Sequence, residues 1–141
     1  MTKKEKSITT MGRKKTAIAR VTIREGAGDI KFNGMPVHLM KPDAAKEAIL
    51  EPIVLAQDVL GKNFEYGLNL SANVNGGGIM GQAYAARTAI GKALVRWTGN
   101  ENLKKVFHDY DRSLIIDDVR KKEPKKYLRK GARAKPIKSY R

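Results

Sequence analysis

The sequence contains no cysteine, and its 141 residues include only two histidines, one tryptophan and three phenylalanines. Without cysteine the chain forms no disulfide and no thiolate metal site, which fits a reducing cytoplasm. An 18-residue apolar run is also lacking, so we expect no membrane-spanning helix. The lysines near the N-terminus are not followed by the apolar stretch of a secretory signal. We therefore expect a cytoplasmic protein.

Acidic residues are scarce too, and the excess of bases is concentrated at the two ends. The chain has 29 lysines and arginines against 14 acids, a net charge of +15. Residues 1–24 carry eight bases and one acid, residues 25–119 ten bases and twelve acids, and residues 120–141 eleven bases and one acid. The three parts thus contribute +7, −2 and +10. Clustered charge of this kind is typical of nucleic-acid-binding proteins.

These charge differences divide the chain into three predicted parts. A chain of this length forms one domain, and we place this globular α/β body at residues 12–119. Residues 1–11 are polar and rich in lysine, so we expect a flexible N-terminal extension. Residues 120–141 have almost no apolar periodicity and repel themselves in water, so they require a polyanion to become ordered. We expect them to form an extended basic RNA-binding tail.

Alternation of apolar and polar residues, typical of half-buried strands, occurs in several segments. Residues 16–24 form the first strand, and Ile30 and Phe32 belong to a second after the turn signal at residues 26–28. We expect these two strands to form a hairpin. Residues 64–75 form the clearest strand, and the apolar run at residues 114–116 predicts a short last one.

Apolar residues at helical spacing predict four helices. Asp43 is expected to cap a short helix that Pro52 ends, and a second short helix extends to Gly61. The longest helix is predicted over residues 79–97 and the last over residues 101–110. Because each long strand has one polar face, helices should cover only one side of the sheet, which makes the fold α+β. The open side would present Arg20, Arg24, Lys31, Asn69 and Asn73.

Gly76, Gly78 and Gly81 match the G-x-G-x-x-G pattern of dinucleotide-binding turns, between a predicted strand and a predicted helix. A dinucleotide fold requires a parallel strand directly after that helix, ending in an acid, whereas here another helix follows. We therefore expect no nucleotide cofactor. Two interpretations remain: the glycines allow a tight turn with close helix–sheet packing, or their N–H groups at the helix N-terminus bind an RNA phosphate.

No set of residues indicates a catalytic or metal site. His38 and His108 are far apart in the sequence, and no nucleophile, base and orienting group occur together. Four acids have lysines and arginines within a few residues, so we expect a charge-compensated loop rather than a metal cluster: Asp109, Asp111, Asp117 and Asp118. We expect no enzymatic activity, no metal and no cofactor.

Three motifs carry a resemblance to a known family. They are Gly12-Arg-Lys-Lys-Thr-Ala-Ile-Ala-Arg20, Asn75-Gly-Gly-Gly-Ile-Met-Gly-Gln-Ala83 with the helix up to Leu94, and the ending Lys138-Ser-Tyr-Arg141. In order and spacing they resemble small-subunit ribosomal protein S nine over about residues 11–141. The run from Glu123 to Lys126 and the ending are similar to the archaeal and eukaryotic branch, and the short length favours an archaeal member.

The resemblance implies a fold, a function and partners. It implies a four-stranded sheet with helices on one face and a left-handed β-α-β crossover, as in the ribosomal protein S five domain-two-like fold. It also implies a structural constituent of the small ribosomal subunit that binds head-domain ribosomal RNA. The tail would reach the anticodon stem-loop of the peptidyl-site tRNA, and the body would contact neighbouring head proteins. No homo-oligomer is expected.

Site residues follow from the basic segments and from the resemblance. Those expected to bind ribosomal RNA are Arg13, Lys14, Lys15, Arg20, Gly77, Gly78, Arg87, Lys121, Lys122, Lys125, Lys126, Arg129, Lys130, Arg133 and Lys135. Those that the resemblance assigns to tRNA are Lys138, Ser139, Tyr140 and Arg141. Two alternatives stay open: a stand-alone RNA-binding module such as a ribosome assembly factor, and an enzyme that uses the glycine turn.

Overall fold

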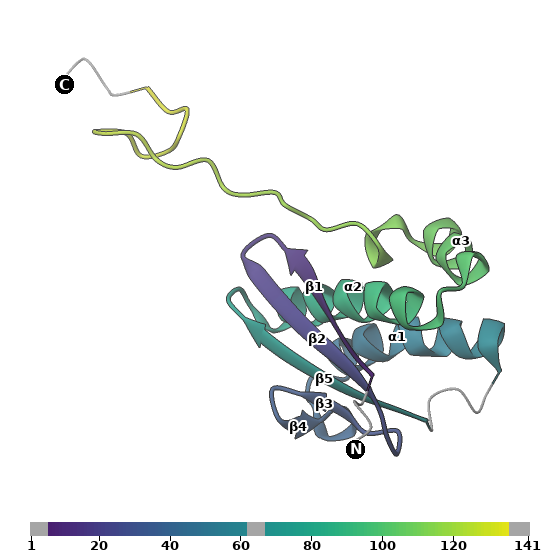
Figure 1. Cartoon of the computed structure of the whole chain (residues 1–141). Coiled ribbons are helices and arrows are strands. Elements are labelled where there is room, and N and C mark those ends of the chain that lie inside the picture. Colours follow the sequence, from purple (N-terminus) through teal and green to yellow (C-terminus); the bar gives the residue numbers. More distant parts are fainter. Residues whose placement is uncertain (1–5, 62–66, 136–141) are drawn as a thin grey trace, which may run out of the picture.

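The computed structural model describes residues 6–61 and 67–135, which form an α+β body with a long C-terminal extension (Figure 1). The body contains a five-stranded mixed sheet and three α-helices within these described ranges. The strands are β1 (Ser7–Lys14), β2 (Ala17–Glu25), β3 (Ile30–Phe32), β4 (Met35–Pro36) and β5 (Leu68–Asn75). The helices are α1 (Asp43–Leu60), α2 (Ile79–Thr98) and α3 (Glu101–Tyr110). No described helix is long and apolar enough to cross a bilayer.

The sheet has the strand order β1-β2-β5-β3-β4, so it has five strands rather than the four expected. The predicted hairpin between residues 16–24 and 30–32 is wrong, because β5 lies between β2 and β3. Asn69 explains this path: its Oδ1 accepts hydrogen bonds from the N–H groups of Ala27, Gly28 and Asp29. The turn after β2 is thereby held against β5, and β3 continues on the far side, parallel to β5.

The first strand corrects the prediction of a flexible extension for residues 7–11, because Ser7–Lys14 pairs with β2 over its whole length. Residues 1–5 of that predicted extension lie outside the described residues. Its inner face carries small or polar residues that do not resemble a core. Thr10 is buried and its hydroxyl donates to the Ala89 carbonyl at 2.7 Å. A Cβ at Gly12 would lie 2.2 Å from the Ala85 oxygen. Only glycine therefore lets β1 lie so close to α2.

The helices confirm most of the predicted apolar stripes. Ala83, Ile90 and Leu94 of α2 are buried, although Ile79 at its start is exposed. Residues 43–60 form one helix, so the prediction that Pro52 ends a first helix is wrong. Pro52 is buried with its neighbours, and this packing outweighs the hydrogen bond that a proline removes from a helix.

The predicted strand at residues 114–116 is also absent. Residues 112–114 form a short 3₁₀ helix instead. The buried Leu114 packs across α2, where its carbonyl oxygen would lie 2.6 Å from a Cβ at position 91. An apolar run of three residues indicates that a segment is buried, but it does not distinguish a strand from a helical turn. The 3₁₀ turn was therefore not predictable.

The core lies between the inner face of the sheet and the helices. Ala19, Val21 and Ile23 of β2 are fully buried, and their neighbours in sequence point to the opposite, uncovered face. The predicted polar face is confirmed there: Arg24, Lys31, Asn69 and Asn73 line one shallow hollow of about 380 Å³. One face of the sheet is thus left free in the part of the chain that the structure describes.

Candidate nucleic-acid interface

The tip of the β1–β2 hairpin lies against the glycine turn that precedes α2. Lys15 adopts a positive φ of 55° at the hairpin tip, and Gly76 and Gly77 have φ of 78° and 69°. A Cβ on Gly76 would approach the carbonyl oxygen of Thr16 to 2.7 Å. The tight-turn interpretation is therefore confirmed at Gly76, whereas a Cβ on Gly78 would meet nothing within 4 Å. We call this group, residues 13–15 and 76–78, the basic corner.

The basic corner also contains the N-terminus of α2. Gly78 is its N-cap, and no described side chain caps the first turn. Backbone N–H groups in such a first turn are free to donate to an external anion, and the helix dipole favours negative charge there. Gly77 and Gly78 are exposed, as a phosphate contact requires. The geometry is thus compatible with the phosphate-binding interpretation as well.

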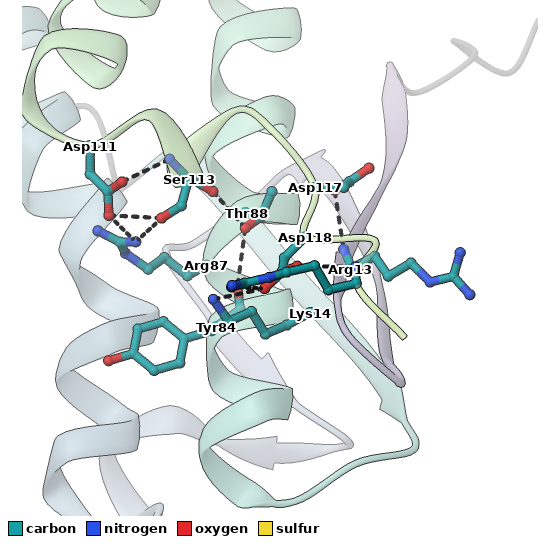
Figure 2. A network of polar contacts seen from close by, with 10 residues as sticks. Arg13, Lys14, Tyr84, Arg87, Thr88, Asp111, Ser113, Asp117 and Asp118 are labelled. Atoms are coloured by element: carbon teal, nitrogen blue, oxygen red, sulfur yellow. Dashed lines mark hydrogen bonds and ion pairs between the residues drawn. The ribbon is translucent and has the colours of Figure 1, made fainter. Parts of the chain in front are cut away.

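Arg13 and Arg20 extend the positive charge over the open face of the sheet. Arg13 is paired in register with Ile18 and Arg20 with Met11, so both arginines belong to the outward-pointing set of residues. Figure 2 shows the Arg13 side chain directed away from the polar network behind it. Its Nε is buried and has no hydrogen-bond partner among the described residues. Arg13 as a whole is half-buried, so only part of its side chain is accessible to a phosphate.

Lys14 points to the other side and is partly committed within the protein. Its Nζ lies 3.3 Å from a carboxylate oxygen of Asp118 and 5.6 Å from the centroid of the Tyr84 ring. Lys15 at the hairpin tip is exposed. Of the two adjacent lysines, Lys15 is the one that is free to reach a phosphate without giving up a charge partner.

The tail begins at the edge of β1, next to the basic corner. Asp118 donates its N–H to the Arg13 carbonyl at 3.0 Å, and Lys15 donates to the Asp118 carbonyl at 2.9 Å. This parallel bridge attaches the tail root, residues 117–120, to the sheet. Hydrogen bonds from Arg120, and then from Lys14, lower the pKa of Asp118 far below its usual range. The carboxylate is therefore ionised at neutral pH.

Beyond the root, residues 121–135 extend away from the body (Figure 1). All the predicted RNA-binding bases in this stretch are exposed: Lys121, Lys122, Lys125, Lys126, Arg129, Lys130, Arg133 and Lys135. Glu123, the one acid of the segment, accepts a hydrogen bond from Arg133 Nε at 3.0 Å. Tyr127 is 89% exposed, so its ring is free to stack. The predicted tRNA-binding residues 138–141 lie outside the described residues.

Arg87 was predicted to bind RNA, and the structure corrects this. Its side chain is only 5% exposed and forms ion pairs with Glu51 of α1 and with Asp111 after α3. Burial alone would lower the pKa of Arg87, but the hydrogen bonds that its guanidinium donates to these two carboxylates outweigh burial and raise the pKa. Figure 2 shows its guanidinium between Asp111 and Ser113. Arg87 therefore joins three helices and is not available to phosphate.

The predicted charge compensation is confirmed for Asp111, Asp117 and Asp118, but most of their partners are not neighbours in sequence, and Asp109 lies near His108 instead of a lysine or arginine. Asp111 pairs with Arg87, Asp117 with Lys92 and Asp118 with Lys14 and Arg120. The described residues contain no group of three or more His, Asp or Glu that could hold a metal. Local charge balance predicted the neutralisation, whereas the partners depend on how α2 and β1 pack.

Comparisons with known proteins identify relatives of the chain. A family model described as ribosomal protein S9/S16 matches residues 12–141. The chain is 42% identical over 136 residues to the small ribosomal subunit protein uS9 of Methanothrix thermoacetophila, which covers 96% of this chain and 99% of the relative. It is 44% identical over 138 residues to the uS9 proteins of Methanococcus vannielii and Methanococcus maripaludis, with the same coverage.

Proposed function

Because the chain belongs to the ribosomal protein S9/S16 family, we propose that it is a structural, non-enzymatic component of the small ribosomal subunit in the cytoplasm. The family resemblance that three sequence motifs predicted is thereby confirmed. In this role the protein binds ribosomal RNA of the subunit head and contacts neighbouring head proteins. The family resemblance also implies a left-handed crossover for the unit β3-α1-β5.

One observation carries the RNA-binding proposal: hydrogen bonds at the tail root join the two basic segments of the chain at the edge of β1. The tail root is hydrogen-bonded to Arg13 and Lys15, so the tail begins where the basic corner ends. Arg13, Lys15 and the exposed tail bases can then contact successive phosphates of one RNA. Phosphate contacts from several bases supply affinity through counterion release, and such contacts position a protein without reading sequence.

We expect the full-length protein to remain with small ribosomal subunits when they are sedimented through a high-salt gradient. A structural constituent buried among RNA helices stays bound, whereas a stand-alone RNA-binding module or assembly factor is released as salt screens its contacts. Mass spectrometry of the subunit peak measures the ratio of this protein to other subunit proteins. A ratio far below one per subunit would support the assembly-factor alternative, and binding of labelled nucleotide to the purified protein would support the enzyme alternative.

The end of the tail is proposed to contact the anticodon stem-loop of the peptidyl-site tRNA, through Lys138, Ser139, Tyr140 and Arg141. Removing only residues 139–141 is expected to leave subunit assembly unchanged and to weaken tRNA retention about tenfold, the loss of one charge-assisted contact. Filter binding of labelled tRNA to mutant and normal subunits measures this. A matched control replaces Lys104, an exposed residue of α3, which also removes one positive charge. Equal tRNA occupancy with and without residues 139–141 would contradict the proposal.

A further inference from the structure

We propose that Asp117 and Asp118 are positioning residues, and that these two acids strengthen RNA binding by fixing the direction in which the tail leaves the body. The inference rests on the proposed RNA-binding function. It is unexpected on charge alone, because an acid beside a polyanion normally weakens binding. The argument depends on what the two carboxylates hold together.

Asp118 joins the tail to β1 through both its backbone and its side chain. Its carboxylate accepts two hydrogen bonds from the Arg120 guanidinium, at 2.9 and 2.8 Å, and one from the Arg120 N–H at 3.1 Å. Lys14 of β1 lies 3.3 Å from the same carboxylate. The side chain is only 14% exposed. These contacts fix the backbone over residues 118–120, where the tail leaves the sheet.

Asp117 joins the same root to α2. Its Oδ1 accepts hydrogen bonds from Lys92 Nζ at 2.6 Å and from the Arg13 N–H at 3.1 Å. Lys92 also donates to the Met11 carbonyl at 3.1 Å. A strand, a helix and the tail root therefore meet at one carboxylate. Figure 2 shows Asp117 and Asp118 close to Arg13 and Lys14.

The consequence is a fixed geometry between two RNA-binding surfaces. A tail that left the body in random directions would have to be oriented when the RNA binds, and this ordering would weaken the affinity. With the root fixed, binding at the basic corner places the first tail bases near the same RNA. The second contact then becomes intramolecular, with a raised effective concentration. The two acids thus raise the RNA affinity by fixing the direction of the tail, although their negative charge alone would lower it.

The test replaces Asp118 by alanine in the full-length protein and measures affinity for a small-subunit head RNA fragment by fluorescence anisotropy. We expect affinity to fall about tenfold, although the substitution makes the protein more positive by one charge. Asp109→Ala is the matched control, because that acid is 83% exposed on α3 and its loss should leave affinity equal or slightly higher. An Asp118→Ala affinity equal to or above that of the control would overturn the inference.

A second measurement separates positioning from general loss of folding. Asp118→Ala is repeated in a protein whose tail contacts are weakened by Lys125→Ala and Lys126→Ala. If Asp118 acts through the tail, its substitution should have a smaller effect in this background, and an equal effect would overturn the inference. Asp118→Asn, which keeps the side-chain shape, is judged by the same criteria if the alanine variant unfolds. Absence of tight RNA binding by the unmodified protein would instead contradict the proposed function itself.

Discussion

Deleting residues 120–141 is expected to leave a folded body that no longer binds RNA tightly at physiological salt. The last buried side chain of the described chain is Leu114, so the core does not depend on the deleted segment. The tail contributes +10 of the net charge, whereas residues 25–119 are slightly acidic. Binding through roughly six to ten phosphate contacts weakens about 10³- to 10⁵-fold between 50 and 200 mM salt. The tail should therefore account for most of the RNA affinity and most of its salt dependence.

Fluorescence anisotropy with a head RNA fragment, repeated over a range of salt concentrations, measures both effects. The slope of log affinity against log salt should become shallower by roughly 0.7 to 0.9 for each lost phosphate contact. Lys104→Ala together with Lys105→Ala is the control, since it removes charge from exposed positions on α3, away from the basic corner. Unchanged affinity of the truncated protein, with thermal unfolding showing an intact body, would mean that the tail is not the main RNA-binding element.

The sequence predicted those elements whose burial follows a simple period. In β2 and β5 the buried residues alternate, and in α2 they recur at helical spacing, because in each case one face meets the core. Periodicity did not predict β1, since its two buried positions are Thr10 and Gly12 rather than large apolar residues. These small residues are needed because α2 packs directly against them, and the sequence of β1 alone does not show this contact.

Long-range contacts account for the other differences. Asn69 appears in the sequence as one polar residue of an alternating strand. In the structure it accepts three hydrogen bonds from the turn after β2, and these hold the turn against β5 so that β3 pairs on its far side. The RNA-binding role of the two charged ends was predictable from composition, because affinity for a polyanion depends on local charge density. The partners of Arg87, Lys92 and Lys14 were not, because each ion pair joins segments that are far apart in sequence. Composition therefore predicts that a site exists, and packing decides which bases belong to it.

Arg87 makes this distinction measurable. Replacing it by methionine is expected to destabilise the body by about 2–3 kcal/mol, because the buried guanidinium is lost and two carboxylates keep their charge without a partner. Glu51 and Asp111 are 26% and 39% exposed, so water solvates them in part and the effect stays below that of a fully buried pair. Thermal unfolding should show a Tm lower by roughly 10 °C. Arg112→Met, which removes an exposed arginine nearby, is the control.

RNA affinity of the folded Arg87→Met protein should equal that of the Arg112→Met protein, since neither side chain belongs to the basic corner or the tail. A normal Tm with weakened RNA binding would instead indicate that Arg87 contacts RNA. Adding Glu51→Gln to Arg87→Met provides a further check, because it removes one of the two unpaired negative charges. The double variant should recover part of the lost stability, which is the non-additivity expected when two residues act through one ion pair. A phosphate-binding arginine would show no such coupling to an acid of α1.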